Sequence, residues 1–136
     1  MTGHAHAVVW IDHRTAKIFE FNRQEAESRT IRHADAAVQI HHKSGSIGSG
    51  HATEDAAYLQ EVIDALEGPA EILIMGPSHV KWQLRAYINL HAPHLAQRVM
   101  AVTDADHPSD GEILDAARKY FSRVDHMTPQ LNAHTP

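Results

Sequence analysis

Four short apolar runs limit how this chain can fold. They occupy residues 7–11, 17–21, 72–75 and 99–102. Each has the length of a buried strand and is too short for a helix. Only residues 12–16 separate the first two runs, which predicts a β-hairpin, whereas stretches with helical periodicity flank the last two. The chain should therefore begin with a small β-meander and continue with alternating helices and strands.

A third extended segment follows the predicted hairpin. Along residues 27–33, polar and apolar side chains alternate. Ser28, Thr30 and Arg32 would point to one face of the strand, and Arg29, Ile31 and His33 to the other. This polar alternation is typical of an edge strand. We expect the extended chain to resume at residues 38–42, after a break or bulge in the alanine-rich residues 33–37. Residues 44–50 contain three glycines and predict a flexible loop.

Three helices are expected in the rest of the chain. The first should start at Thr53, a candidate N-cap, and stop at residues 68–69, Gly-Pro. The second should start after Ser78, and the third at a capping box of Ser109 and Glu112. Their apolar stripes are Leu59, Val62, Ile63 and Leu66; Val80, Leu84, Tyr87 and Ile88; and Ile113, Leu114, Ala117, Tyr120, Phe121 and Val124.

These elements predict an α/β fold in the order β-β-β-α-β-α-β-α. Right-handed crossovers would place the later strands parallel to the first, in a five-stranded mixed sheet of the ribonuclease-H-like kind covered by helices. A chain of 136 residues is long enough for one such core. We therefore expect a single domain over residues 7–125, a flexible N-terminus at 1–6 and a flexible C-terminal tail at 126–136.

Composition narrows the functional classes. The chain has no cysteine, which excludes disulfides and thiolate metal sites. The first residues are polar and the run at 7–11 is too short for a signal peptide or a membrane span, so we expect a cytoplasmic protein without membrane partners. A formal net charge of −5 argues against nucleic-acid binding by the whole surface. Any RNA contact must be local, and no cofactor is expected.

The glycine-containing loop is the first candidate binding site. Its residues are His41, His42, Lys43, Gly45, Gly48, Gly50 and His51. Imidazole and ammonium groups surround glycines whose backbone amides can approach a phosphate closely, and no acidic residue follows before Glu54. The alternative is a plain connection between a strand and a helix, since glycine-containing loops often have no other role.

The second predicted helix is the other candidate. No acidic residue occurs between Ile72 and Thr103. Helical spacing places Lys81, Trp82 and Arg85 on the side opposite the apolar stripe. An exposed tryptophan beside two cations suits stacking on a base or docking on a protein. The alternative is that Trp82 only covers the margin of the sheet.

Two further kinds of site have weaker patterns. Imidazoles of His41, His42 and His51, or of His4 and His6, are possible ligands of Zn²⁺ or Ni²⁺, but their spacing matches no standard template, which favours incidental binding or none.

A two-metal nuclease would need converging carboxylates, and the available acids are Asp12, Asp104, Asp106 and Asp110, with Asp55 near a helix cap. Turn formation explains Asp12 and a helix start explains Asp110.

Several phrases of the sequence resemble one family. They are VVWIDHRTAKIFEF (8–21), HHKSGSIGSGH (41–51), ILIMGPSHVKWQL (72–84) and DHPSDGEILDAARKYF (106–121). The chain resembles the middle domain of eukaryotic and archaeal class-1 peptide-chain release factors and of Pelota, and more closely small bacterial proteins labelled translational machinery protein. The resemblance implies the fold expected above and a role in translation, with the ribosome, tRNA or a translation factor as partner.

One departure from that family bears on activity. Its release factors carry a Gly-Gly-Gln tripeptide in the loop after the third strand, where this chain has Gly48-Ser49-Gly50 followed by His51. The glutamine is missing, so no catalytic residue transfers from the resemblance. We expect a noncatalytic domain that binds RNA or protein through the loop and the basic helix. The alternatives are a hydrolase acting on RNA or peptidyl-tRNA and a homo-oligomeric stress or scaffold protein.

Overall fold

The structure is a computed structural model, and it describes residues 5–34 and 49–133, with side chains described only to Ala34 and then from Asp55 to Val124. Its strands are β1 (His6–Ile11), β2 (Thr15–Phe21), β3 (Ala26–Arg32), β4 (Glu71–Gly76) and β5 (Val99–Asp104). Its helices are α2 (Ser49–Ala65), α3 (Val80–His91), the short α4 (Pro93–Ala96) and α5 (Asp110–Ala133). The predicted order of strands and helices is confirmed, with α4 as an addition.

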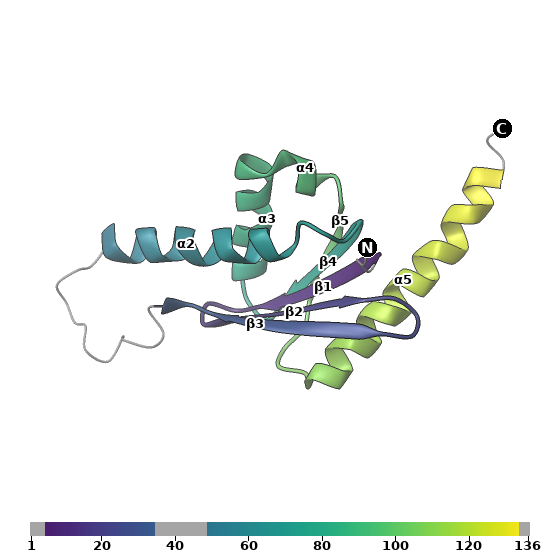
Figure 1. The fold of residues 1–136 in the computed structure, drawn as a ribbon, viewed down its shortest axis with the longest axis horizontal. Helices are drawn as coiled ribbons and strands as arrows, with labels where there is room; N and C mark the ends of the chain where they lie inside the picture. Colours follow the sequence, from purple (N-terminus) through teal and green to yellow (C-terminus); the bar gives the residue numbers. More distant parts are fainter. Residues whose placement is uncertain (1–4, 35–48, 134–136) are drawn as a thin grey trace.

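The strands form one mixed sheet in the order β3-β2-β1-β4-β5 (Figure 1). Val8 pairs with Phe19 in the antiparallel β1–β2 hairpin and with Leu73 in the parallel β1–β4 pair. The predicted five-stranded α/β architecture and the edge position of β3 are confirmed. Because β1, β3, β4 and β5 run in one direction, their C-terminal ends share an edge of the sheet, here called the carboxyl edge.

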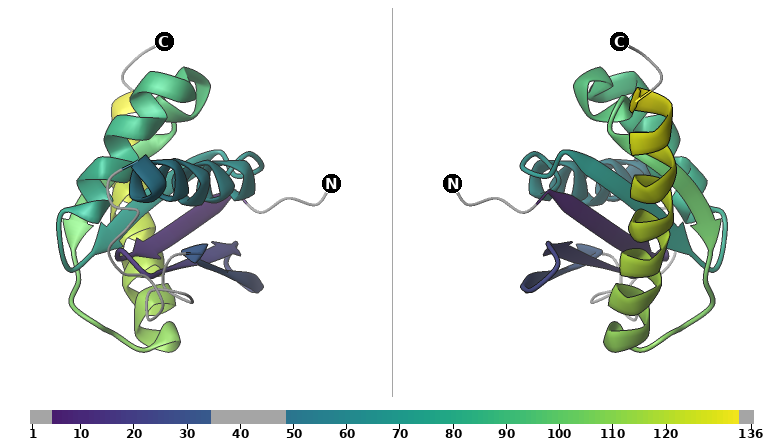
Figure 2. Two further views of the ribbon diagram at one scale, coloured as in Figure 1. Left: turned by 90° about the vertical axis from the view of Figure 1, so that its left-hand side faces the viewer. Right: turned by 90° about the vertical axis from the view of Figure 1, so that its right-hand side faces the viewer.

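Helices cover the two faces of the sheet unequally (Figure 2). The face packed against α2, α3 and α4, here the α2 face, buries Ala7, Val9, Ile11, Ala16, Ile18, Ile31, Ile72 and Ile74 with Val62, Ile63, Leu66, Val80, Leu84, Ile88 and Leu95. The opposite face, here the α5 face, buries Val8, Trp10, Phe19, Phe21, Leu73 and Met75 with Ile113, Ala117 and Phe121. Successive strand residues alternate between the two faces, as the pleat requires.

One predicted helix start and one predicted helix cap are wrong. The backbone of α2 is helical from Ser49, one turn before Thr53, so Gly50 and His51 belong to the helix and not to the preceding loop. A good N-cap contributes only about 1 kcal/mol, which is too little to choose between starts one turn apart. Helix α3 is preceded by His79, without a side-chain cap, and the Ser78 hydroxyl lies buried with no hydrogen-bond partner in the described part of the chain.

The last helix has the predicted start but extends further than expected. The capping box is confirmed, because Ser109 N–H donates to Glu112 Oε1 at 2.8 Å and Glu112 N–H donates to Ser109 Oγ at 3.2 Å. The backbone of α5 stays helical to Ala133, through the segment predicted to be a tail. The proline at 129 removes one helical N–H, yet its fixed φ is compatible with a helix.

Candidate functional site

The carboxyl edge brings together polar residues from distant parts of the sequence. Asp12 follows β1, His33 follows β3, Lys81 lies in the first turn of α3 after β4, and residues 104–107 end and follow β5. In sheets with parallel strands, this edge is where ligands commonly bind. The carboxyl edge is therefore the candidate functional site.

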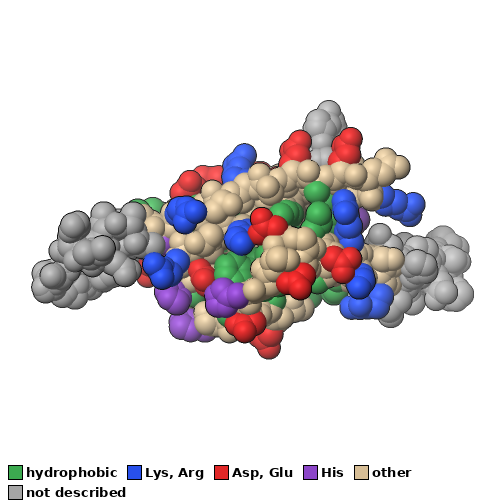
Figure 3. All heavy atoms as spheres, turned by 90° about the horizontal axis from the view of Figure 1, so that it is seen from below, with side chains coloured by type: hydrophobic (Ala, Val, Ile, Leu, Met, Phe, Trp, Pro, Cys, Tyr) green, Lys and Arg blue, Asp and Glu red, His purple; other side chains and the backbone are tan. Residues whose placement is uncertain are grey.

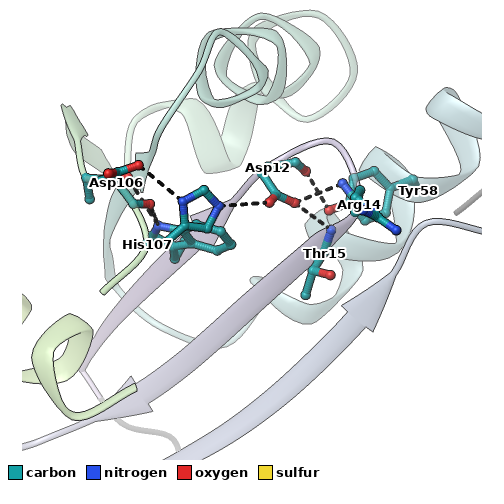
Figure 4. A network of polar contacts seen from close by, with 8 residues as sticks. Asp12, Arg14, Thr15, Tyr58, Asp106 and His107 are labelled. Carbon is teal, nitrogen blue, oxygen red and sulfur yellow. Dashed lines mark hydrogen bonds and ion pairs between the residues drawn. The ribbon is translucent and has the colours of Figure 1, made fainter. Parts of the chain in front are cut away.

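Asp12 organises the β1–β2 turn (Figure 4). Its Oδ1 accepts hydrogen bonds from the backbone N–H groups of Arg14 and Thr15, both at 2.8 Å. This is the turn role that the sequence predicted for the residue, and it is confirmed. The second oxygen, Oδ2, remains free to face His107 Nε2, at 3.7 Å. Asp12 thus combines two structural hydrogen bonds with one carboxylate oxygen that faces His107.

His107 lies between two carboxylates. Its Nδ1 is 3.1 Å from Asp106 Oδ1 on one side, and Asp12 Oδ2 faces the other ring nitrogen (Figure 4). The Trp10 ring supports it edge-on at 5.2 Å between centroids, and Trp10 Nε1–H donates to the Asp106 carbonyl at 3.1 Å. Two-thirds of the His107 side chain remains exposed. The sequence predicts only a structural role for His107, at the entry to the last helix, because only the fold brings residues 12 and 107 together.

Tyr58 and His33 attach α2 to the same edge. The Tyr58 hydroxyl donates to the Asp12 backbone carbonyl at 2.9 Å, and its ring packs against the buried His33 ring at 4.9 Å. Burial, with a contribution from the negative charge of Asp12, raises the pKa of Tyr58, so the hydroxyl stays a donor. His33 Nε2 contacts Asp55 Oδ1 at 2.6 Å. These contacts join the elements on either side of residues 35–48.

The predicted outward position of Lys81 is wrong. Its side chain is buried, with Nζ 2.9 Å from Asp104 Oδ1 and donating to the Ser78 carbonyl at 2.6 Å. The first turn of α3 starts where β4 ends, so one of its side chains meets the end of the neighbouring strand β5. Helical periodicity alone did not reveal this contact. Lys81 therefore fixes the start of α3 against β5 and does not present its charge to a partner.

Trp82 is exposed, as predicted, with 54% of its surface accessible. Arg85 is half-buried, and its Nε lies buried without a hydrogen-bond partner among the described residues. Leu90, which the sequence analysis did not select, is 74% exposed. Trp82, Ala86 and Leu90 recur every four residues, so they form one exposed stripe along α3, here the α3 stripe.

The loop candidate is only partly covered by the described residues. His41, His42, Lys43, Gly45 and Gly48 lie outside them. Gly50 and His51 are in the first turn of α2, and the position of their side chains is not described. The predicted strand at 38–42 also falls outside the described residues. The loop therefore stays a prediction, attached to the sheet at the carboxyl edge through the end of β3.

The acids weighed for two-metal chemistry have other partners. Asp110 Oδ1 lies 2.9 Å from Lys17 Nζ, Asp104 contacts Lys81, and Asp106 contacts His107. In the part of the chain that the structure describes, no three histidine or acidic residues are placed to hold a metal ion. His6 stacks on Phe121 at 4.3 Å between centroids and contacts Glu71 at 3.1 Å, while His4 lies outside the described residues.

Comparisons with known proteins place the fold. No protein-family model matches the chain, and no curated protein matches its sequence. Among solved structures, an archaeal translation termination factor, aRF1, aligns with a TM-score of 0.58 and 12% identity over 95% of this chain and 40% of its own. Pelota from Archaeoglobus fulgidus aligns with a TM-score of 0.57 and 10% identity over 94% of this chain and 37% of its own. Pelota from Thermoplasma acidophilum aligns with a TM-score of 0.57 and 18% identity over 80% of this chain and 30% of its own.

These likenesses establish a shared fold. The chain spans well under half the length of each of the three proteins. Identities of 10–18% leave function to be argued from the chain itself. None of the helices in the described ranges has the length and apolar character needed to cross a membrane.

Proposed function

We propose that this chain is a noncatalytic, cytoplasmic binding domain of the translation machinery, related to the bacterial translational machinery proteins. The observation that carries the proposal is the fold shared with Pelota and with a translation termination factor. The missing Gly-Gly-Gln motif supports binding without peptide release. The expected partner is the ribosome, tRNA or a translation factor.

Two surfaces would make the contact. The α3 stripe offers a large exposed aromatic side chain, Trp82, with the half-buried Arg85 beside it on the same helix. Aromatic and arginine side chains are the groups that most often dominate binding energy at interfaces. The predicted loop with Lys43 lies between β3 and α2 in the sequence, and its cationic residues would contact phosphate. Lys81 takes the supporting role of holding the start of α3 in place.

Sedimentation of tagged protein with ribosomes from cells at low salt tests the proposal. The wild-type protein should co-sediment and should be released as salt rises, because phosphate contacts are salt-dependent. Trp82→Ala and Lys43→Gln should each weaken the association about tenfold, whereas the exposed Arg23→Gln should not. A wild-type protein that stays in the soluble fraction under growth and under starvation contradicts the proposal.

A hydrolase is the second candidate, favoured by the position of His107 between Asp12 and Asp106. An imidazole held by carboxylates is a common general base. Incubation with labelled RNA and with peptidyl-tRNA, with Mg²⁺ and with Zn²⁺, measures this activity directly. Turnover that disappears in both His107→Ala and Asp12→Asn would replace the binding proposal, and an absence of turnover leaves binding as the function.

A further inference from the structure

A groove opens on the α5 face beside strand β5. It has a volume of about 740 Å³, which lies within the usual range for binding sites. Leu73 and Met75 of β4 form its floor with Ile113 of α5, and Tyr120 lines the helix side. Figure 3 views the molecule from below Figure 1 and shows apolar side chains at the surface among charged ones. A second cavity, of about 400 Å³, is lined by Phe21 and Phe121 and so also lies on the α5 face.

The charged groups that line the groove differ in whether they already have a contact. Its three acids already have partners: Asp104 contacts Lys81, Asp106 contacts His107, and Glu112 completes the capping box. Arg123 lies over the Tyr120 ring at 6.0 Å and has no carboxylate partner in the described part of the chain. Lys119, the other cation of the lining, is paired with Asp115, so Arg123 is the exposed cation of the groove that has no described carboxylate partner.

Strand β5 is an edge strand that leaves backbone groups unpaired on its outer side. Strand β5 carries one charged residue, Asp104 at its end, whereas the other edge strand, β3, carries Glu27, Arg29 and Arg32. Charged residues protect an edge from pairing, so β5 is the less protected of the two edges. Met100 has no partner residue in β4, because the register shifts there, and pairing with β4 is regular from Ala101 to Asp104.

We propose that this edge and groove bind an extended, partly acidic peptide segment of a partner protein, which adds to the sheet beside β5. Backbone hydrogen bonds to β5 would supply part of the affinity. Every second side chain of an added strand points to the α5 face, which places apolar side chains in the groove. An acidic residue of the peptide would pair with Arg123. This surface is separate from the α3 stripe and the 41–51 loop, so the two proposals fail independently.

Fluorescence anisotropy with labelled peptides tests the inference on the full chain. The probe is a short peptide of alternating valine and threonine that ends in glutamates, compared with the same peptide ending in lysines. The glutamate peptide should bind about tenfold more tightly, which corresponds to one charge-assisted hydrogen bond. Arg123→Glu should reverse this preference, whereas Arg23→Glu should leave it unchanged.

A second variant tests the groove itself. Ala116 lines the groove on an exposed position of α5, so Ala116→Trp should fill it and abolish peptide binding. Ala57→Trp, at an exposed position of α2, is the matched control and should bind normally. Equal binding of the two peptides, or unchanged binding by folded Ala116→Trp, overturns the proposal. Binding of single-stranded RNA in the groove in place of either peptide overturns it as well.

Discussion

The two faces of the sheet differ in their strand residues and in the helices that cover them. On the α2 face, three helices close over a row of aliphatic side chains that are almost completely buried. On the α5 face, a single helix covers larger side chains, including Trp10, Phe19 and Phe21, and a groove remains beside β5. Because more residues are buried on the α2 face, we expect it to supply most of the stability, whereas the α5 face has room for a ligand.

The two faces also differ in their polar residues, which are buried in structural contacts on one face and accessible to a ligand on the other. On the α2 side, Tyr58 and Lys81 are buried and engaged with backbone carbonyls. On the α5 side, Arg123 and Tyr120 are accessible. A polar residue of this protein is thus a better candidate for binding where the helical cover is incomplete. The following changes test that difference.

Truncation of a leucine on each face should give the largest difference in stability. Leu84 is completely buried on the α2 face, so Leu84→Ala should lower the free energy of unfolding by about 3 kcal/mol. Leu114 is only partly buried on the α5 face, so Leu114→Ala should cost about 1 kcal/mol. Urea denaturation followed by circular dichroism measures both, and equal losses would contradict the proposed division between the faces.

Alkaline pH should act through Tyr58. Burial raises the pKa of this hydroxyl above its ordinary value near 10, so its contribution to stability is complete below about pH 10 and is lost as the pH rises further. Phenolate absorbance should therefore show Tyr58 ionising only as the protein unfolds. In Tyr58→Phe, the loss of stability at alkaline pH should be smaller, because the variant has no hydroxyl to ionise at this position. Ordinary titration of Tyr58 in the folded protein would contradict its burial.

Removal of a tyrosine hydroxyl on each face gives a smaller contrast. Tyr58→Phe removes the hydrogen bond to the Asp12 carbonyl and should cost about 1 kcal/mol. Tyr120→Phe is the matched change on the α5 face, where that hydroxyl has no hydrogen bond within the described structure, and should cost roughly nothing. Thermal unfolding of the two variants checks the pair. A larger loss of stability in Tyr120→Phe than in Tyr58→Phe would mean that the Tyr120 hydroxyl, and not that of Tyr58, has the structural role.

The smallest effect is expected from an ion pair on the α5 side. Lys17 of β2 contacts Asp110 at the start of α5, and the aspartate side chain is largely exposed. Solvent screening limits such pairs, so Asp110→Asn should change stability by about 0.5 kcal/mol or less. The effect should vanish in high salt. A loss comparable with that of Leu114→Ala would mean that this contact, and not apolar packing, holds α5 on the sheet.

The elements of the fold were predictable because their signals are local. The apolar runs at 7–11 and 72–75 mark the central strands, and Ser109 with Glu112 marks the start of α5. Within the candidate site, the exposure of Trp82 also followed from helical spacing. Helix starts were less certain, because capping energies near Ser49 and Ser78 are small.

The rest of the site depends on contacts between distant segments. Lys81 is buried because β5 ends beside the first turn of α3, and no periodicity in the helix encodes that neighbour. His107 meets Asp12, and His33 meets Asp55, only after the strands have assembled. The groove likewise combines residues of β4, β5 and α5. Its position follows from how α5 crosses the sheet, which the sequence pattern does not specify.

Photocrosslinking in cells tests the central functional claim most directly. A photoreactive phenylalanine analogue would replace Trp82 on the α3 stripe, with Glu61 on the exposed side of α2 as the control position. The proposed function predicts crosslinks from position 82 to ribosomal RNA, a ribosomal protein, tRNA or a translation factor, and few from position 61. Crosslinks from position 82 exclusively to proteins outside translation, or none at all, would contradict it.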